Sequence, residues 1–476
     1  MTNLLMVFNA YIIIYFAVLN GLYMFLSAVA FKRLPAYARR LRSFRIDDLV
    51  ASSGGLPMSL LVPAYNEAET IVDSVRSFLT LAYAEHEIVV INDGSSDATL
   101  ARLVSAFDMR KVSRVATTNL ETEPVRCVYQ GRRHPNLFVV DKKNGGKADA
   151  LNAGLNYSRG AIVSAMDADT LLEPDALARV ARPFLEDSRT VAVGGIVRIA
   201  NGCRVEAGSV GEVRLPKKAL PRFQVLEYLR AFLASRVGWD ALGATMIISG
   251  AFGAFRRTVV DAVGGFDSRS VGEDMELVVR IHRHCRDNNI DYKVTFIPDP
   301  VAWTEAPETL SQLAIQRNRW QRGLAQVLNR HSGMIGRPRY GTPGLVALPY
   351  FMMFELFGPV IELLGWIAFG VSLAMGIVSV LHATLFLLLA VFLGSTLSVA
   401  AVALEELSFR RYLRFRDLMT LLGTAMLENF GYRQLTTIWR LRGMIDALRR
   451  DRSWGDMERT GFSKQSDEVA FSPTWT

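Results

Sequence analysis

Between residues 57 and 331 the sequence alternates short apolar runs with segments whose apolar residues recur at helical spacing. This alternation limits the possible folds more than any other feature, because it is typical of a parallel sheet with right-handed crossover helices. The expected fold class is therefore α/β, with a mostly parallel, Rossmann-like sheet. The predicted strands are 58–63, 86–93, 136–141 and 161–167, and the predicted helices are 67–81, 95–107 and 147–158.

Acidic residues follow these predicted strands at their carboxyl ends. Glu67 follows the first strand, Asp93 and Asp141 close the next two, and Asp167 and Asp169 close the fourth. One acidic residue in such a place is often only a turn former or a helix cap. Four acidic ends on one edge indicate a site, because ligands bind where the strands of such sheets end.

Asp167 and Asp169 lie two residues apart on an extended segment and therefore point to the same side. Two like charges so close together cost free energy unless a cation or hydrogen-bond donors offset them. Carboxylate oxygens suit Mg²⁺ or Mn²⁺, and such an ion could neutralise a diphosphate leaving group. Three lysines follow the preceding strand and could assist, at Lys142, Lys143 and Lys147.

Two further segments carry residues suited to chemistry. Glu273 and Asp274 begin a predicted amphipathic helix over 270–284, where acidic residues also stabilise the helix start. A carboxylate there could also act as a general base. On a predicted helix over 313–328, one face holds side chains able to clamp phosphate and stack on a sugar ring, or simply to pack: Gln316, Arg319 and Trp320.

Three stretches are almost free of charge, at 4–31, 363–381 and 383–404. Each is about as long as a membrane span requires, whereas buried core helices are the alternative. Basic residues follow the first stretch, so the positive-inside rule places the N-terminus outside and the remaining chain in the cytoplasm. The other two stretches predict a hairpin that turns near His382.

The expected organisation is a multi-pass protein of the plasma (inner) membrane with a cytoplasmic α/β domain. Its predicted parts are an anchor at 1–31, a basic cytoplasmic linker at 32–56, the α/β domain at 57–331, an interfacial helix plus transmembrane hairpin at 345–404, and a basic, partly amphipathic cytoplasmic region at 405–476. The polar stretch over 110–134 reads as an insertion without an evident role.

The formal net charge of +8 does not indicate nucleic acid as a partner. The basic residues crowd the segments that flank the apolar stretches, where anionic lipid headgroups account for them. The three cysteines, Cys127, Cys203 and Cys285, show no paired spacing. They predict neither a disulfide framework nor a zinc site, as expected for a reducing cytoplasm.

Four motifs in order resemble those of the family 2 glycosyltransferases with a GT-A fold. They are Asp93 in "VINDGSSDAT", "DAD" at 167–169, "ED" at 273–274 and "QRNRW" at 316–320. With the flanking apolar stretches, the chain resembles the membrane-embedded synthases of cellulose, chitin, hyaluronan and poly-N-acetylglucosamine. The resemblance implies an inverting enzyme that builds a β-linked polysaccharide from a UDP-sugar, UDP-GlcNAc or UDP-Glc, and couples synthesis to export.

The resemblance also implies a role for each matching position. Asp93 would hold the uridine, with Pro63, Tyr65 and Glu67 near it, and Lys147 would lie near the diphosphate. Asp167 and Asp169 would bind the nucleotide and the metal ion, Mg²⁺ or Mn²⁺, with Asp169 as the main ligand. Asp274, with Glu273 beside it, would deprotonate the acceptor hydroxyl. The diphosphate and the acceptor glycan would contact Gln316, Arg319 and Trp320.

Two departures leave alternatives open. Gly272 precedes Glu273 where cellulose synthases have threonine, so specificity for glucose is not supported. Three spans are fewer than such synthases have, so accessory export subunits could complete a channel, or the enzyme could add one sugar to a lipid acceptor. A non-catalytic receptor or transporter component that only binds nucleotide is the alternative outside the enzymes.

Overall fold

The computed structural model describes residues 2–43, 55–206, 208–409, 411–412 and 414–449. The chain forms two compact units, and each is described by itself. The sheet unit contains Arg42–Lys217 and Thr245–Ala306. The helical unit contains Met1–Leu41, Lys218–Ala244 and Pro307–Gly455.

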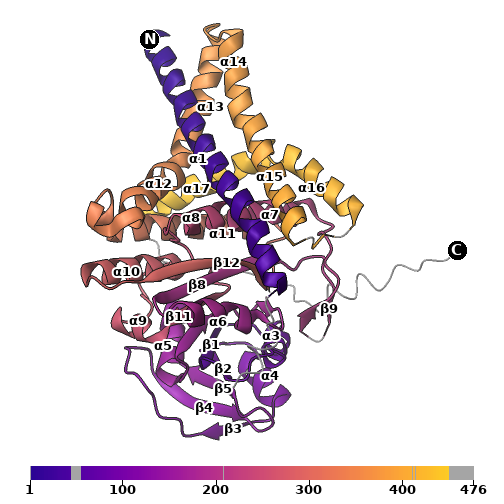
Figure 1. Ribbon diagram of the computed structural model, residues 1–476, viewed down its shortest axis with the longest axis vertical. Coiled ribbons are helices and arrows are strands. Elements are labelled where there is room, and N and C mark those ends of the chain that lie inside the picture. Colours follow the sequence, from indigo (N-terminus) through magenta and orange to yellow (C-terminus); the bar gives the residue numbers. More distant parts are fainter. Residues whose placement is uncertain (1, 44–54, 207, 410, 413, 450–476) are drawn as a thin grey trace, which may run out of the picture. The chain divides into compact units, whose positions relative to one another are not determined.

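One ten-stranded sheet forms the centre of the sheet unit, in the order β3-β4-β5-β2-β1-β6-β11-β8-β12-β7 (Figure 1). Neighbours among β5, β2, β1 and β6 are parallel, as are β8 and β12. The remaining pairs are antiparallel. The α/β prediction is therefore confirmed, with antiparallel strands added at both sides of a parallel core. The strands are β1 Met58–Ala64, β2 His86–Asp93, β3 Met109–Val112, β4 Val125–Gly131, β5 Leu137–Lys142, β6 Ile162–Ala165, β7 Leu171–Leu172, β8 Thr190–Ile199, β11 Gly253–Arg256 and β12 Lys293–Thr304, and a separate pair is β9 Val205–Glu206 with β10 Ser209–Val210.

The helices of this unit are α3 Ile71–Leu79, α4 Thr99–Ala106, α5 Lys147–Tyr157, α6 Ala176–Glu186, α9 Arg257–Ala262 and α10 Glu273–Asp287. Helix α5 packs directly on β1 and β2. The packing is so close that an added Cβ at Gly154 would come within 2.9 Å of Ile91 Cδ1. Helix α4 starts later than the pattern predicts, since Asp97 Oδ1 accepts a hydrogen bond from the Thr99 N–H at 2.9 Å and holds a turn.

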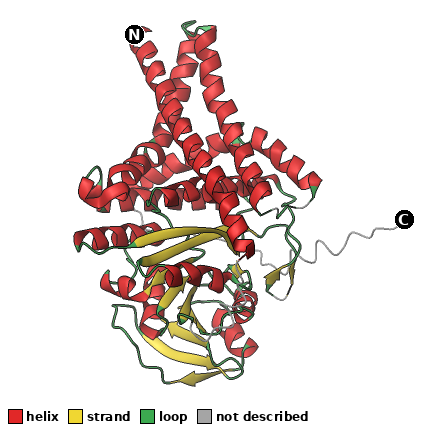
Figure 2. Cartoon of the chain, viewed as in Figure 1, coloured by secondary structure: helices red, strands yellow, loops and turns green. Residues whose placement is uncertain are grey.

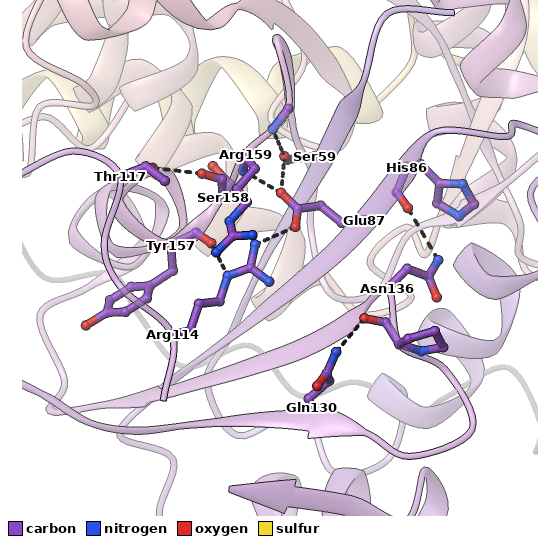
Figure 3. Close-up of polar contacts among 12 residues, drawn as sticks. Ser59, His86, Glu87, Arg114, Thr117, Gln130, Asn136, Tyr157, Ser158 and Arg159 are labelled. Carbon is purple, nitrogen blue, oxygen red and sulfur yellow. Dashed lines mark hydrogen bonds and ion pairs between the residues drawn. The ribbon is translucent and has the colours of Figure 1, made fainter. Parts of the chain in front are cut away.

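The polar stretch over 110–134, which the sequence marks as an insertion without an evident role, contributes two strands to the sheet. Its ends form β3 and β4, and residues 113–124 between them form a segment that we call the strap. Arg114 holds the strap to the sheet, with its Nη2 2.5 Å from Glu87 Oε2 and its Nε donating to the Tyr157 carbonyl at 2.8 Å (Figure 3). The guanidinium also stacks 3.6 Å from the Phe138 ring centroid.

The described part of the helical unit consists of helices and connecting loops (Figure 2). Its buried charges pair across distant segments: Arg230 Nη1 lies 2.7 Å from Glu428 Oε1, and Ser398 donates to the same oxygen at 2.6 Å. The helices are α1 Thr2–Ser43, α7 Ala219–Leu229, η1 Arg230–Arg236, α8 Val237–Ala241, α11 Leu310–Arg330, η2 Ser332–Met334, η3 Pro338–Tyr340, η4 Pro343–Ala347, α12 Leu348–Tyr350, η5 Phe351–Leu356, α13 Gly358–Ala374, α14 Val380–Leu387, η6 Leu388–Phe392, α15 Leu393–Ser408, α16 Phe415–Leu427 and α17 Tyr432–Leu448.

One described helix, Leu5–Arg39, is long and apolar enough to cross a membrane. Pro343–Leu356 and Gly358–Ala374 meet the same criteria together and are bent by 43° at their junction. The turn of the predicted hairpin lies a few residues before His382: α13 ends at Ala374, Gly376 has a φ of +66°, and α14 starts at Val380. The multi-pass topology stays a prediction, and the predicted C-terminal region beyond residue 449 lies outside the described residues.

We expect Arg114→Met to lower the stability of the sheet unit. The Arg114 and Glu87 side chains are only 6% and 15% exposed, so the substitution leaves a mostly buried carboxylate without its counter-ion. Breaking such a pair costs about 2–4 kcal/mol, which thermal unfolding in detergent would measure. Arg110→Met is the matched control, because Arg110 is exposed on β3; an equal change in both variants would contradict the assigned role of Arg114.

Candidate functional site

Four strand ends that the sequence marks as polar lie on one edge of the sheet. Asn92 at the end of β2 pairs with Ala64 of β1, and Asp93 pairs with Lys142 of β5. β6 ends beside β1, where the Met166 N–H donates to the Leu61 carbonyl at 3.1 Å, and Asp167 follows directly. The parallel register thus gathers acidic side chains from separate crossover units.

Lys147, the first residue of α5, joins two carboxylates in this edge. Its Nζ lies 2.6 Å from Asp167 Oδ1 and 2.8 Å from Glu273 Oε1. Burial alone would lower the pKa of Lys147, but the nearby carboxylates of Asp167 and Glu273 outweigh it and raise this pKa. The ammonium group therefore stays charged at every physiological pH.

A small residue makes room for this ammonium group. Gly250 precedes β11, and β11 runs antiparallel to β6 with Gly253 opposite Ala165. An added Cβ at Gly250 would lie 2.9 Å from Lys147 Nζ and 3.6 Å from Asp274 Oδ2. The Gly250 N–H also donates to Asp274 Oδ2 at 3.2 Å. The segment before β11 therefore lies against both the lysine and the start of α10.

The two acidic residues at the start of α10 differ in accessibility. Glu273 is 5% exposed and is paired with Lys147. Asp274 is half-buried, accepts hydrogen bonds from Gly250 and from the Met275 N–H at 2.7 Å, and has no ion pair among the described residues. Of the two carboxylates, Asp274 is thus the one that can take up a proton from a bound molecule.

Asp93 is held in place by contacts within its own chain. Its Oδ1 lies 2.7 Å from Lys142 Nζ and accepts the Gly145 N–H at 3.0 Å, and its Oδ2 accepts the Gly146 N–H at 2.8 Å. Lys142 is fully buried, and its Nζ also lies 2.5 Å from Asp149 Oδ1. The expectation that Lys142 assists a phosphate is therefore wrong, and a uridine contact by Asp93 stays a prediction.

The residues after β1 form a loop that is linked to the loop after β2. Tyr65 is 51% exposed, and the Glu67 N–H donates to Thr99 Oγ1 at 2.9 Å. Asn66, with a φ of +56°, accepts the Ser96 N–H at 2.9 Å. Pro63, the residue before the last of β1, lies beside Ile91 of β2. These predicted uridine contacts therefore lie on the edge that carries Asp93, and their binding role stays a prediction.

The carboxylates of Asp167 and Asp169 fit a divalent metal ion by their donor chemistry. Both follow β6, and Asp169 is 1% exposed while the Asp167 side chain is 33% exposed. The described residues contain no group of three or more histidine, cysteine, aspartate or glutamate residues arranged to hold a metal. A metal ion here would thus complete its coordination with oxygens of a bound ligand and with water.

The predicted acceptor residues lie in the helical unit. Gln316, Arg319 and Trp320 are on α11, where Gln316 is 8% exposed and Trp320 is 45% exposed. Arg317, between them, stacks 4.4 Å from the Trp320 ring and pairs with Glu227 at 2.5 Å. The expected position of the three residues beside the carboxylates stays a prediction.

A buried histidine on α10, which sequence reasoning missed, fixes the segment that leads to Gly250. His282 Nε2 lies 2.9 Å from the Thr245 carbonyl and must donate to it, so Nδ1 accepts the Tyr292 hydroxyl at 2.8 Å. Burial lowers the pKa of His282 to about 4. A single histidine in an amphipathic helix gives no signal by which the sequence could reveal this contact.

Residues 56–323 match the model of a family described as "Glycosyltransferase like family 2". The chain is 31% identical over 273 residues to the poly-beta-1,6-N-acetyl-D-glucosamine synthase of Staphylococcus epidermidis. It is 30% identical over 274 residues to the protein of that name from Staphylococcus aureus strain COL. Each match covers 57% of this chain and 56% of the relative, so the chain matches a little over half the length of these curated relatives.

Among solved structures, a mannosyltransferase from Pyrobaculum calidifontis in complex with GDP-Man and Mn²⁺ is similar with a TM-score of 0.50 at 20% identity. The likeness covers 86% of this chain and 99% of that chain. Together with the family match, it confirms the GT-A fold expected from the motifs.

We expect stability to fall as the pH drops from 6.5 towards 4, because the unfolded chain then binds a proton that the buried His282 resists. The pKa of this histidine is 6.5 in the unfolded chain and about 4 in the folded chain. The difference of about 2.5 corresponds to roughly 3 kcal/mol in the free energy of unfolding. Melting temperatures across this range should depend less on pH in His282→Gln than in the native chain. His284→Gln, on the same helix, should keep the native dependence, and an unchanged His282→Gln profile would contradict the expectation.

Proposed function

The chain belongs to the family 2 glycosyltransferases, and on that premise we propose that it builds a β-linked polymer of N-acetylglucosamine from UDP-N-acetylglucosamine. The observation that carries the proposal is the meeting of Asp167, Lys147, Glu273 and Asp274 at the carboxyl edge of the sheet. The relatives are named as synthases of poly-beta-1,6-N-acetyl-D-glucosamine, which supports N-acetylglucosamine as the sugar in preference to glucose.

The proposed reaction is a single displacement that inverts the anomeric carbon. Asp274 takes the proton of the acceptor hydroxyl, and that oxygen forms a bond to the anomeric carbon while the bond to the diphosphate oxygen breaks. UDP leaves with the electron pair of the broken bond. Asp274 suits the role of base because it is accessible and lacks an ion pair among the described residues, whereas Glu273 is buried against Lys147.

Charge balance on the donor side is the second part of the proposal. Lys147 and the carboxylates of Asp167 and Asp169 would orient the diphosphate. Asp93 and Tyr65 would contact the uridine. Asp167 and Asp169 would hold Mg²⁺ or Mn²⁺, which would supply positive charge against the leaving diphosphate when bound. The Mn²⁺ in the complex of the similar mannosyltransferase supports such a site in this fold.

On the acceptor side, Gln316, Arg319 and Trp320 would bind the diphosphate and the growing glycan, with the exposed Trp320 ring as a stacking surface. We place the enzyme in the inner membrane as a multi-pass protein with its catalytic domain in the cytoplasm, and we propose that synthesis is coupled to export with accessory subunits. The apolar helix Leu5–Arg39 supports the membrane location.

We expect membranes that contain the chain to convert radiolabelled UDP-N-acetylglucosamine into products longer than one added sugar. Asp274→Asn keeps the shape of the side chain but cannot take the proton, so transfer should fall at least about 100-fold while UDP binding changes little. Product sizing across a panel of UDP-sugars measures the first point and calorimetry with UDP the second.

Asp261→Asn is the matched control for that variant, because Asp261 is an acidic residue of the sheet unit on α9 and not in the site. If the product is a lipid with one added sugar, the chain is a single-addition transferase and the proposed polymer synthesis is wrong. Transfer by Asp274→Asn at the native rate would remove Asp274 as the base.

We expect EDTA to stop transfer and added Mn²⁺ or Mg²⁺ to restore it. Mn²⁺ should also strengthen UDP binding to the native chain by at least about tenfold, because it offsets the charge between the diphosphate and the carboxylates. This gain should be lost in Asp169→Asn and kept in Asp175→Asn, whose carboxylate precedes α6. Equal UDP affinity with and without Mn²⁺ would contradict the metal assignment.

A further inference from the structure

Helix α5 carries two asparagines, Asn152 and Asn156, which lie one turn apart and bind the backbone of two different segments. Asn152 Nδ2 donates to the Phe266 carbonyl at 2.9 Å, and the Phe266 N–H donates to Asn152 Oδ1 at 2.7 Å. Asn156 binds Leu120 in the same way, with both distances 2.9 Å. The two side chains are 6% and 7% exposed. Each amide therefore acts as a buried clamp with both of its polar atoms used.

The two clamps hold segments of different importance for the site. Leu120 belongs to the strap, which does not carry a proposed catalytic group. Phe266 precedes Glu273 by seven residues, in the segment that leads into α10. Helix α5 is thus joined to this segment and to α10 at two points. Lys147 at its start pairs with Glu273, and Asn152 binds Phe266 one segment earlier in the chain.

The segment around Phe266 is shaped for this contact. Gly264 and Gly265 have φ values of +82° and +74°, a region that favours glycine. An added Cβ at Gly265 would lie 2.4 Å from Asn152 Oδ1, whereas at Gly264 nothing lies within 4 Å. Arg280 of α10 donates to the Gly265 carbonyl at 2.8 Å, so the segment is held from the side of α10 as well.

We propose that Asn152 is a positioning residue for sugar transfer. It fixes the segment before α10 to α5 and thereby sets the distance between Lys147 and the carboxylates of Glu273 and Asp274. This inference rests on the proposed function, in which Asp274 is the base. Asn152 acts through these groups, and small displacements of a base from its proton cost large factors in rate.

The test compares Asn152→Ala with Asn156→Ala. Asn152→Ala removes two hydrogen bonds, and Asn156→Ala removes three, because Asn156 Oδ1 also accepts the Thr118 hydroxyl at 2.9 Å. Each leaves one buried backbone N–H and one carbonyl without that partner, so Asn156→Ala should lower the melting temperature at least as much as Asn152→Ala. Only Asn152→Ala should lower kcat, by about tenfold or more, with the donor KM changed less than about twofold. It should also shift the acid limb of the pH profile of kcat, which a loss of stability alone would not do.

A second pair of variants tests the clamp from the other side and serves if Asn152→Ala does not fold. Gly265→Ala and Gly264→Ala introduce the same backbone strain, but only the first places a methyl group against Asn152. We expect the larger loss of kcat in Gly265→Ala. Equal losses of kcat within either pair, or a native kcat in Asn152→Ala, would overturn the proposal.

Hydrogen–deuterium exchange separates the failure of this inference from failure of the proposed function. Backbone amides over 266–276 should exchange faster in Asn152→Ala than in Asn156→Ala or the native chain, whether or not transfer occurs. Unchanged exchange there would overturn the clamp. A native chain that transfers no sugar from any UDP-sugar, yet shows the exchange difference, would refute the proposed function and leave the positioning of the segment established.

Discussion

The ammonium group of Lys147, held between Asp167 and Glu273, is the interaction on which the rest of the site depends. Three elements must be in place before this contact can form: the consecutive elements α5 and β6, and α10, which begins more than 100 residues later. A buried charge without partners is strongly unfavourable, so the pairing selects the arrangement in which all three meet. Gly250 belongs to the same arrangement, since a larger residue would occupy the space of the ammonium group.

Behind this contact lies a second layer of paired charges. Lys142 pairs with both Asp93 and Asp149, and Asp93 in turn accepts hydrogen bonds from the N–H groups of Gly145 and Gly146 just before α5. Two lysines, one buried behind the edge and one within it, therefore offset only part of the negative charge of the acidic edge. Asp274 is left as an accessible carboxylate without an ion pair among the described residues.

The strands and the strand-end acids could be predicted because their signals are local, in short apolar runs that each end in a polar residue. The partners of those acids could not, because nothing near Lys142 in the sequence separates a fully buried lysine from one that faces a phosphate. The same holds for Asn152, which bonds to Phe266 more than 100 residues later. The turn of the hairpin lies a few residues before His382, because Gly376 follows the end of α13 within a stretch whose apolar composition is uniform.

The pairing of Arg230 with Glu428 and Ser398 has a consequence for biosynthesis. Arg230 emerges from the ribosome long before either partner, so an early-folding helical unit would enclose an uncompensated guanidinium. Chains that stop before Glu428 would leave the Arg230 guanidinium without this ion-pair partner, even where the sheet unit is complete.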